Sequence, residues 1–196
     1  MKILTALALC LCVSTAQADL VDDADAAYQK GDYATAFRLL TQLAEQGHAS
    51  AQAAIGAMYQ IGQGTPQDSA EALKWYRLSA EQGDALAQFN LGVMYDIGQG
   101  TPQDYAEALK WYRLAAEQGH AKAQFFLGIM YNDGLGVLQD FVEAHRWYNL
   151  AASRQTHEGR RNIAIKHRDG IAAKMTPAQI AEAQKLAKQW DKAHPR

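Results

Sequence analysis

Hydrophobic and small residues recur along the chain with helical spacing. Within residues 49–84, Ala51, Ile55 and Met58 lie at positions i, i+4 and i+7, which places them on one face of a helix. A loop at 61–66 breaks this helix, because its proline cannot continue a helix and its glycines permit positive φ angles. The stretch therefore predicts one helix of about three turns followed by a loop.

A second helix is predicted after the loop. It begins at an aspartate followed three residues later by a glutamate, an arrangement that resembles a capping box, and it ends at Gly83 as a C-terminal cap. A pair of acids can also serve in acid–base catalysis, but a catalytic pair would be expected once. The pair recurs at every predicted second helix, which indicates capping. The pairs are Asp68 and Glu71, Asp104 and Glu107, and Asp140 and Glu143.

Each second helix also carries a Trp-Tyr pair, at 75–76, 111–112 and 147–148. These rings could stack on the ring of a ligand. We expect them instead to fill the seam between the two helices. There the missing side chains of three glycines let the backbones approach. These glycines are Gly56, Gly92 and Gly128.

The whole two-helix stretch repeats at a period of 36 residues. Residues 85–120 match 49–84 at 27 of 36 positions and match 121–156 at 19 of 36, and the positions kept in the third copy are mostly small, aromatic or turn residues. A fixed period of this length predicts a solenoid, in which each repeat buries its apolar face only against its neighbours. We therefore divide this part of the chain into three repeats, 49–84, 85–120 and 121–156.

Shorter segments flank the repeats and are predicted to cap them. Residues 19–48 predict a helical hairpin joined by a tight turn at 30–32. Residues 157–196 predict a carboxy-terminal helical cap, with one helix near 160–171 and another that starts with Thr-Pro-Ala-Gln at 176–179. The first of these helices is locally basic, which suits either a solvated face or a surface for an acidic partner.

Residues 1–18 have the pattern of a secretory signal peptide. Lys2 is followed by an apolar run over 3–13 and by Ala-Gln-Ala at 16–18, and the run is shorter than the roughly 20 residues needed to span a bilayer. Both cysteines, Cys10 and Cys12, fall in this leader, and neither follows the small residue that a lipoprotein acceptor cysteine requires. We expect a periplasmic or secreted protein without disulfides and without membrane insertion after cleavage.

Composition argues against several kinds of chemistry. The net charge is −2 over 196 residues and no basic run is present, so nucleic acid is not an expected partner. No histidine has a second ligand at i+3 or i+4, and neither a nucleophile elbow nor a phosphate-binding loop occurs. We expect no catalytic residues, no metal site and no cofactor.

The repeated pattern resembles a known family. Residues 85–119 fit A-x-A-Q-x-x-L-G-x-M-Y-x-x-G-x-G-x-x-x-D-x-x-x-A-x-x-W-Y-x-x-A-A-x-x-G, which is similar to the Sel1-like repeat, a relative of the tetratricopeptide repeat. The third repeat departs from it, with Gln155 in place of the closing glycine and Val-Leu at 137–138 in place of Thr-Pro. The resemblance implies an all-α, right-handed α/α superhelical solenoid whose first helices line a concave groove.

The resemblance also implies which residues face that groove. An apolar stripe would be rimmed by polar side chains, and large aromatic residues exposed there would mark a partner site. The alternative is that the phenylalanines bury themselves against a neighbouring repeat. The groove positions are Gln60, Leu86, Phe89, Val93, Asp96, Lys122, Phe125, Ile129 and Asn132.

Two functions are consistent with these patterns. The first is a non-catalytic adaptor of the bacterial envelope that binds a peptide or protein partner in the groove, as the resemblance implies. The alternative is an envelope enzyme or small-molecule binder, similar to cysteine-rich Sel1-like relatives that interact with β-lactams. Those relatives have a disulfide in each repeat, whereas this chain has no cysteine after its leader.

Overall fold

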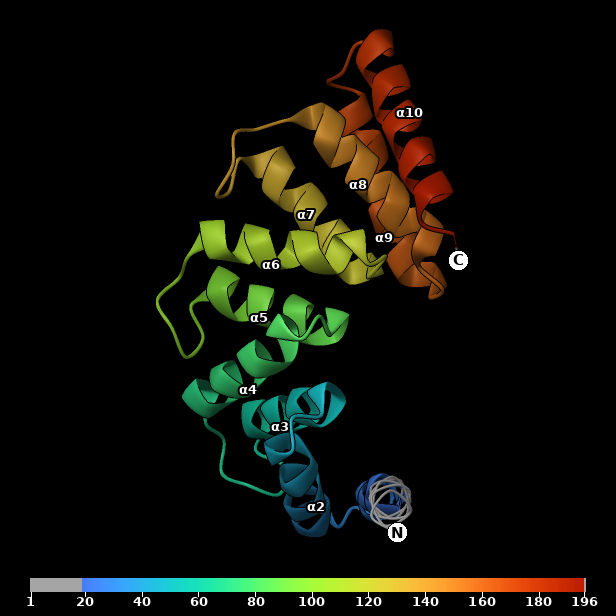
Figure 1. The fold of residues 1–196 in the computed structure, drawn as a ribbon. Helices are drawn as coiled ribbons and strands as arrows, with labels where there is room; N and C mark the ends of the chain where they lie inside the picture. The colour runs from blue at the N-terminus through green and yellow to red at the C-terminus, as the bar shows by residue number, and fades with distance from the viewer. Residues whose placement is uncertain (1–18, 196) are drawn as a thin grey trace, which may run out of the picture. The chain divides into compact units, whose positions relative to one another are not determined.

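A computed structural model describes residues 19–195, and the predicted signal peptide with both cysteines lies outside them. Every regular element in this part of the chain is a helix, so the prediction of an all-α repeat solenoid is confirmed (Figure 1). Residues 19–29 form the first described helix. The others are α2 (Tyr33–Glu45), α3 (Ala49–Ile61), α4 (Ser69–Glu81), α5 (Ala85–Ile97), α6 (Tyr105–Glu117), α7 (Ala121–Asp133), α8 (Phe141–Arg154), α9 (Glu158–Ala172) and α10 (Pro177–Ala193).

The chain forms two compact units that divide between Gln82 and Gly83. In the amino-terminal unit, the helix over 19–29 meets α2 through the predicted tight turn, where Gly31 has a φ of 78°. Helices α2, α3 and α4 then pack in sequence order. In the carboxy-terminal unit, α5 packs on α6, α6 on α7 and α7 on α8, and both α9 and α10 pack against α8.

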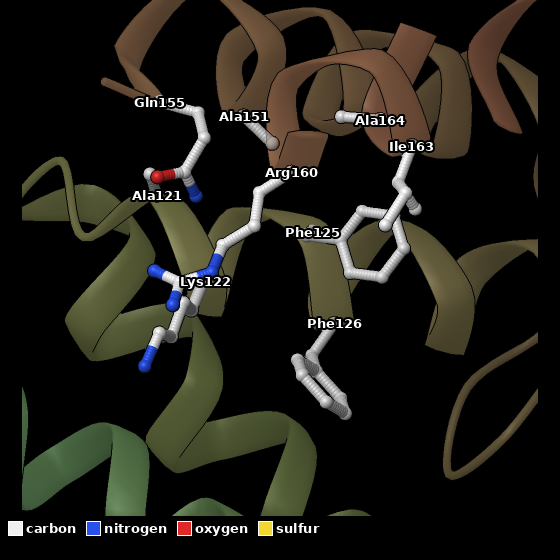
Figure 2. Close-up of a pocket in the computed structure, with 9 residues that line it drawn as sticks. All are labelled: Ala121, Lys122, Phe125, Phe126, Ala151, Gln155, Arg160, Ile163 and Ala164. Carbon is white, nitrogen blue, oxygen red and sulfur yellow. The ribbon is translucent and has the colours of Figure 1, made fainter. Parts of the chain in front are cut away.

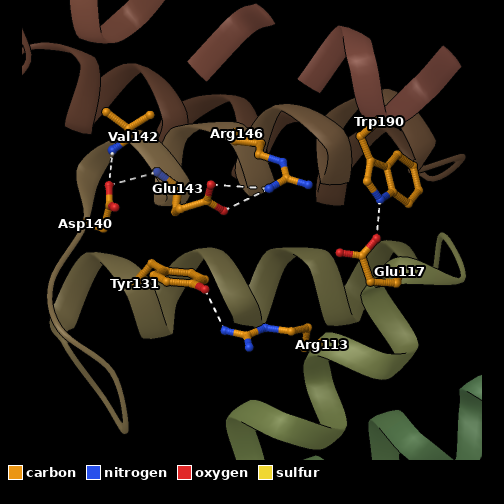
Figure 3. A network of polar contacts seen from close by, with 8 residues as sticks. All are labelled: Arg113, Glu117, Tyr131, Asp140, Val142, Glu143, Arg146 and Trp190. Atoms are coloured by element: carbon orange, nitrogen blue, oxygen red, sulfur yellow. Dashed lines mark hydrogen bonds and ion pairs between the residues drawn. The ribbon is translucent and has the colours of Figure 1, made fainter. Parts of the chain in front are cut away.

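The aspartates that open the second helices cap them as predicted. Asp140 Oδ1 accepts hydrogen bonds from the backbone N–H groups of Val142 and Glu143 at 2.9 and 3.1 Å (Figure 3). The reciprocal half of a capping box is not formed, because the Glu143 carboxylate pairs with Arg146 at 3.1 Å. Asp68 and Asp104 repeat the same pattern.

A seam between glycine and tyrosine holds each pair of repeat helices together. A Cβ atom placed on Gly92 would lie 2.7 Å from Cδ1 of Tyr112, so the ring occupies the space that any larger residue would need. Gly56 with Tyr76 and Gly128 with Tyr148 have the same arrangement, at 2.8 and 2.7 Å. All three tyrosines are fully buried, as expected for residues that fill the seam.

Glutamines cross-brace the repeats, a feature that the sequence patterns did not indicate. In the carboxy-terminal unit, Gln118 Nε2 donates to Oε1 of the buried Gln88 at 2.8 Å and to the carbonyl of Gly83 at 2.9 Å. One repeat later Gln124 Nε2 donates to the carbonyl of Ala116 at 3.1 Å, but Gln124 Oε1 has no partner. Arg154 occupies the position that Gln118 has in the preceding repeat.

Arg154 instead fastens the last helix. Helix α8 runs one residue further than α4 and α6 because Gln155, in extended conformation, replaces the closing glycine. The Arg154 guanidinium binds Asp191 at 3.1 Å and the carbonyl of His194, and it lies 4.6 Å from the ring of Trp190.

The two predicted helices of the carboxy-terminal cap are present as α9 and α10. Thr176 and Gln179 form the predicted capping box at the start of α10, with Thr176 N–H donating to Gln179 Oε1 at 2.8 Å. Trp190 Nε1 donates to the Glu117 carboxylate at 2.5 Å, so α10 is also bonded to the end of α6 (Figure 3).

The glycine–tyrosine seam leads to a stability prediction. We expect Gly92→Leu to lower the free energy of unfolding by about 1–3 kcal/mol or more, because the added side chain overpacks the seam against Tyr112. Thermal and urea denaturation of the purified protein would measure the effect. Gly170→Leu is the matched control, since a Cβ at this helical glycine of α9 meets nothing within 4 Å. An equal loss in both variants would contradict the role of the seam.

Candidate functional site

The predicted polar rim contributes to the scaffold. Gln60 Oε1 accepts from the Tyr76 hydroxyl at 3.0 Å, and Asp96 accepts from the Tyr112 hydroxyl at 3.1 Å. Burial and, after it, the Asp96 carboxylate raise the pKa of the Tyr112 hydroxyl well above its usual value, so this hydroxyl stays a neutral donor. In the third repeat, Asn132 Nδ2 donates to its neighbour Asp133 at 2.5 Å.

Phe89 is a buried part of the scaffold. Only 7% of its surface is exposed. Its ring centroid lies 4.9 Å from that of His120, 5.7 Å from that of Phe126 and 5.8 Å from that of Tyr112. The expectation of an exposed aromatic at position 89 is therefore wrong. The alternative, burial against the neighbouring repeat, applies to this residue, because Phe126 of the following repeat and His120, the residue that caps α7, supply two of the three rings.

The other predicted groove positions on α5 and α7 retain some exposure. Leu86 is 52% exposed. Lys122 is exposed as well, while Val93, Phe125 and Ile129 are half-buried. No contact in the structure tests whether these residues bind a partner, so that assignment remains a prediction.

Two of these residues, Lys122 and Phe125, line a pocket between α7, α8 and α9 that we call the α7–α9 pocket (Figure 2). Its volume is about 230 Å³. The walls are mostly apolar, with three polar side chains among them. The lining residues are Ala121, Lys122, Phe125, Phe126, Ala151, Gln155, Arg160, Ile163 and Ala164.

Helix α9 forms one wall because it is packed onto the third repeat. Ile171 of α9 joins the buried cluster of Ala144 and Tyr148, and Phe125 and Ile129 pack against that cluster. The His167 ring of α9 lies 5.1 Å from the Phe125 ring. The cap therefore covers part of the predicted groove surface of α7 and leaves the α7–α9 pocket beside the covered part.

Sequence reasoning predicted only Lys122 and Phe125 of the nine lining residues as groove positions, and it missed, among others, Phe126, Arg160 and Ile163. Phe126 could have been noticed, because the first two repeats have Ala54 and Asn90 at the equivalent position. Arg160 and Ile163 lie beyond the end of the period, where no repeat indicates which face of a helix is turned inward.

The pocket lining carries few kinds of polar group. Among residues 19–195, none of the lining side chains has a hydroxyl, thiol, carboxylate or imidazole group. Within residues 19–195, no three His, Cys, Asp or Glu side chains gather where they could hold a metal ion. None of the helices in this range combines the length and apolar character needed to cross a membrane. What the lining offers is apolar surface, two cationic groups and one amide.

Comparison with known proteins gives a consistent family match. The sequence family described as Sel1 repeat matches residues 25–48, 49–84, 85–120 and 121–155, which is more than half of the chain. Comparison with the curated proteins gave no significant match.

Two solved structures resemble the chain closely. One is a protective antigen of uropathogenic Escherichia coli with an SLR fold, at 34% identity and a TM-score of 0.73, covering 82% of this chain and 33% of that one. The chain thus spans about a third of that antigen. The other is a Sel1 repeat protein from Oxalobacter formigenes, at 33% identity and a TM-score of 0.65, covering 84% of this chain and 72% of that one.

His120, next to the pocket, is sensitive to protonation. It precedes α7, and its Nδ1 accepts a hydrogen bond from the Ala123 N–H at 3.3 Å, which only the unprotonated nitrogen can do. Burial and then the nearby Lys122 lower the pKa of His120 below its ordinary 6.5, while Asp84 opposes them. The unfolded chain therefore binds a proton here more readily than the folded chain, and stability falls as the pH drops below about 6.5.

We expect His120→Asn to reduce the loss of stability between pH 7.5 and pH 5.5. Asparagine can still cap α7 but does not titrate, and Asp84 at the equivalent position of α5 already accepts from the Ala87 N–H at 2.7 Å. Urea unfolding at both pH values would give the difference for each protein. His145, whose pKa is also lowered by burial, is unchanged in both and sets the background. An equal loss of unfolding free energy between pH 7.5 and pH 5.5 in the variant and the parent protein would contradict the prediction.

Proposed function

The chain belongs to the Sel1 repeat family, and from that premise we propose that it is a non-catalytic adaptor of the bacterial envelope that binds a protein or peptide partner. Repeats of this family generally serve in protein–protein interaction. Their architecture suits that role, because stacked repeats present an extended surface built from many small contacts.

The observation that carries the proposal is the α7–α9 pocket. It combines phenylalanine side chains with arginine at the surface, and aromatic residues and arginine are enriched where protein interfaces have most of their binding energy. Its volume of about 230 Å³ is below the roughly 300–1,000 Å³ of pockets that enclose small-molecule ligands. A cavity of this size suits an anchor side chain of a larger partner.

The envelope location rests on the leader. A basic residue, an apolar run of about ten residues and an Ala-Gln-Ala site are the features that direct export and cleavage. The second function, an envelope enzyme acting on β-lactams, has no such support. A covalent route would need a hydroxyl or thiol in the pocket, and the lining has neither.

Affinity capture from an envelope extract tests the adaptor, with the mature chain from Asp19 as bait. We expect Ile163→Asp to reduce capture of the partner at least about tenfold, because a charge would replace a 51%-exposed apolar wall of the pocket. Leu138→Asp is the matched control. It makes the same change at a residue that is 88% exposed in the loop between α7 and α8, outside the pocket lining.

Quantitative mass spectrometry of the captured proteins separates the outcomes. A protein that is lost with Ile163→Asp and kept with Leu138→Asp supports the proposal. Equal capture by all three proteins would contradict a role for this surface. Sustained β-lactam hydrolysis by the purified chain would contradict the non-catalytic assignment.

A further inference from the structure

The α7–α9 pocket has two cations without counter-ions. Lys122 on α7 and Arg160 on α9 both line it, and neither has a carboxylate within ion-pair distance among residues 19–195. Both arginines of the intervening helix α8 behave differently, since Arg146 pairs with Glu143 and Arg154 with Asp191. The two cations line one cavity from separate helices, and Lys122 Nζ also lies 5.9 Å from the centroid of the Phe89 ring.

The cations and the apolar walls are segregated within the pocket. Figure 2 shows the side chains of Lys122, Arg160 and Gln155 together on one side and those of Phe125, Phe126 and Ile163 on the other. An anion on the polar side would receive charge-assisted hydrogen bonds from a lysine and an arginine, which are among the strongest that proteins form. An apolar group on the other side would be removed from water and would pack against two aromatic rings. The pocket therefore suits a ligand with both parts next to each other.

The last residue of a polypeptide has this composition. Its α-carboxylate is separated from its side chain by a single carbon atom, and one large apolar side chain suits a cavity of about 230 Å³. Internal residues of a chain lack the carboxylate. An acidic side chain supplies a carboxylate without an apolar group beside it.

We propose that the α7–α9 pocket binds the carboxy-terminal residue of a partner polypeptide, with its apolar side chain against Phe125, Phe126 and Ile163 and its carboxylate between Lys122 and Arg160. This inference rests on the proposed adaptor function and names the chemistry of the partner. It also fixes the orientation of the bound partner, because its carboxy-terminus lies inside the pocket and the preceding residues extend out of it.

A second cavity adjoins the α7–α9 pocket, and we expect the preceding residues of the partner to run there. It shares Ile163 with the α7–α9 pocket and is lined by Lys166, His167 and Lys174 of the same cap segment. Neither lysine has an ion pair within residues 19–195. Acidic residues a few positions before the carboxy-terminus of the partner would face these cations. The preferred partner ends in acidic residues followed by a large apolar residue.

Fluorescence anisotropy with defined peptides tests the proposal directly. The probe is an amino-terminally labelled hexapeptide, Asp-Glu-Gly-Ala-Gly-Phe, with a free carboxylate, and its matched control is the same peptide with a carboxy-terminal amide. We expect the free acid to bind at least about tenfold more tightly than the amide, because a hydrogen-bonded ionic contact is lost. Equal binding of the two peptides would overturn the proposal.

Two matched variants assign the effect to the pocket. Lys122→Gln/Arg160→Gln should abolish the preference for the free acid, and Lys188→Gln/Lys192→Gln should retain it. The second variant removes the same charge from exposed positions of α10 outside the pocket. Circular dichroism verifies that both variants fold. A preference that survives in the first variant would overturn the assignment to Lys122 and Arg160.

Further outcomes separate this inference from the adaptor function. Binding of a free amphipathic acid such as decanoate, with no binding of the acid peptide, would overturn the peptide proposal in favour of a small-molecule site. If the acid and amide peptides bind equally and Ile163→Asp still loses the captured protein, only the recognition of a terminal carboxylate is refuted and the adaptor function stands. The reverse result, acid-selective peptide binding with no captured protein, would support the pocket chemistry and contradict the envelope adaptor.

Discussion

The contact between a glycine on one helix and a tyrosine ring on the next is the constraint on which each repeat depends. A Cβ atom at Gly56, Gly92 or Gly128 would come within 2.7–2.8 Å of the ring, so the two helices approach more closely than any larger residue would allow. The ring's hydroxyl then needs a partner because it is buried, and in the first two repeats Gln60 and Asp96 supply one. The same contact that packs the repeat thus engages two polar residues that would otherwise be available at the surface.

The third repeat must pack against a helix that is not a further repeat, and one side-chain contact differs there from the preceding repeat. In the repeat before it, Gln118 donates to the buried Gln88, so the amide of the first helix is satisfied. At the equivalent position Arg154 binds Asp191 and the carbonyl of His194, and Gln124 Oε1 is left without a partner. One hydrogen bond inside the repeat is exchanged for charge-assisted bonds that hold α10 over the end of the stack. Helix α10 is therefore held against α8 and is part of the fold.

The sequence alone indicates the repeating part of this structure well and the part beyond it poorly. Local sequence rules predict the period, the helix starts, the closing glycines and the glycine–tyrosine seam. Each repeat shows the same pattern, so a wrong assignment in one repeat would disagree with the other two. A one-dimensional pattern does not tell whether the Phe89 side chain faces solvent or packs inside the protein. The contacts of its ring with those of His120 and Phe126 decide that in favour of burial. The pocket could not be found in advance, since Arg160 and Ile163 come from a helix outside the period and their facing depends on tertiary packing.

The site therefore lies where the period fails, and there is a physical reason for that. Between the second and third repeats, α6 packs on α7, and the Phe126 ring lies against the rings of Phe89 and Tyr112. Helix α9 is not a copy of a repeat helix, so Ile171 and His167 pack on the third repeat whereas Arg160 and Ile163 line a cavity beside it. The same repeat has replaced Leu86 by Lys122 and Asn90 by Phe126 at equivalent positions. These two changes supply a cation and an aromatic wall at the place where packing is incomplete, which is what a recognition site on an otherwise self-complementary scaffold requires.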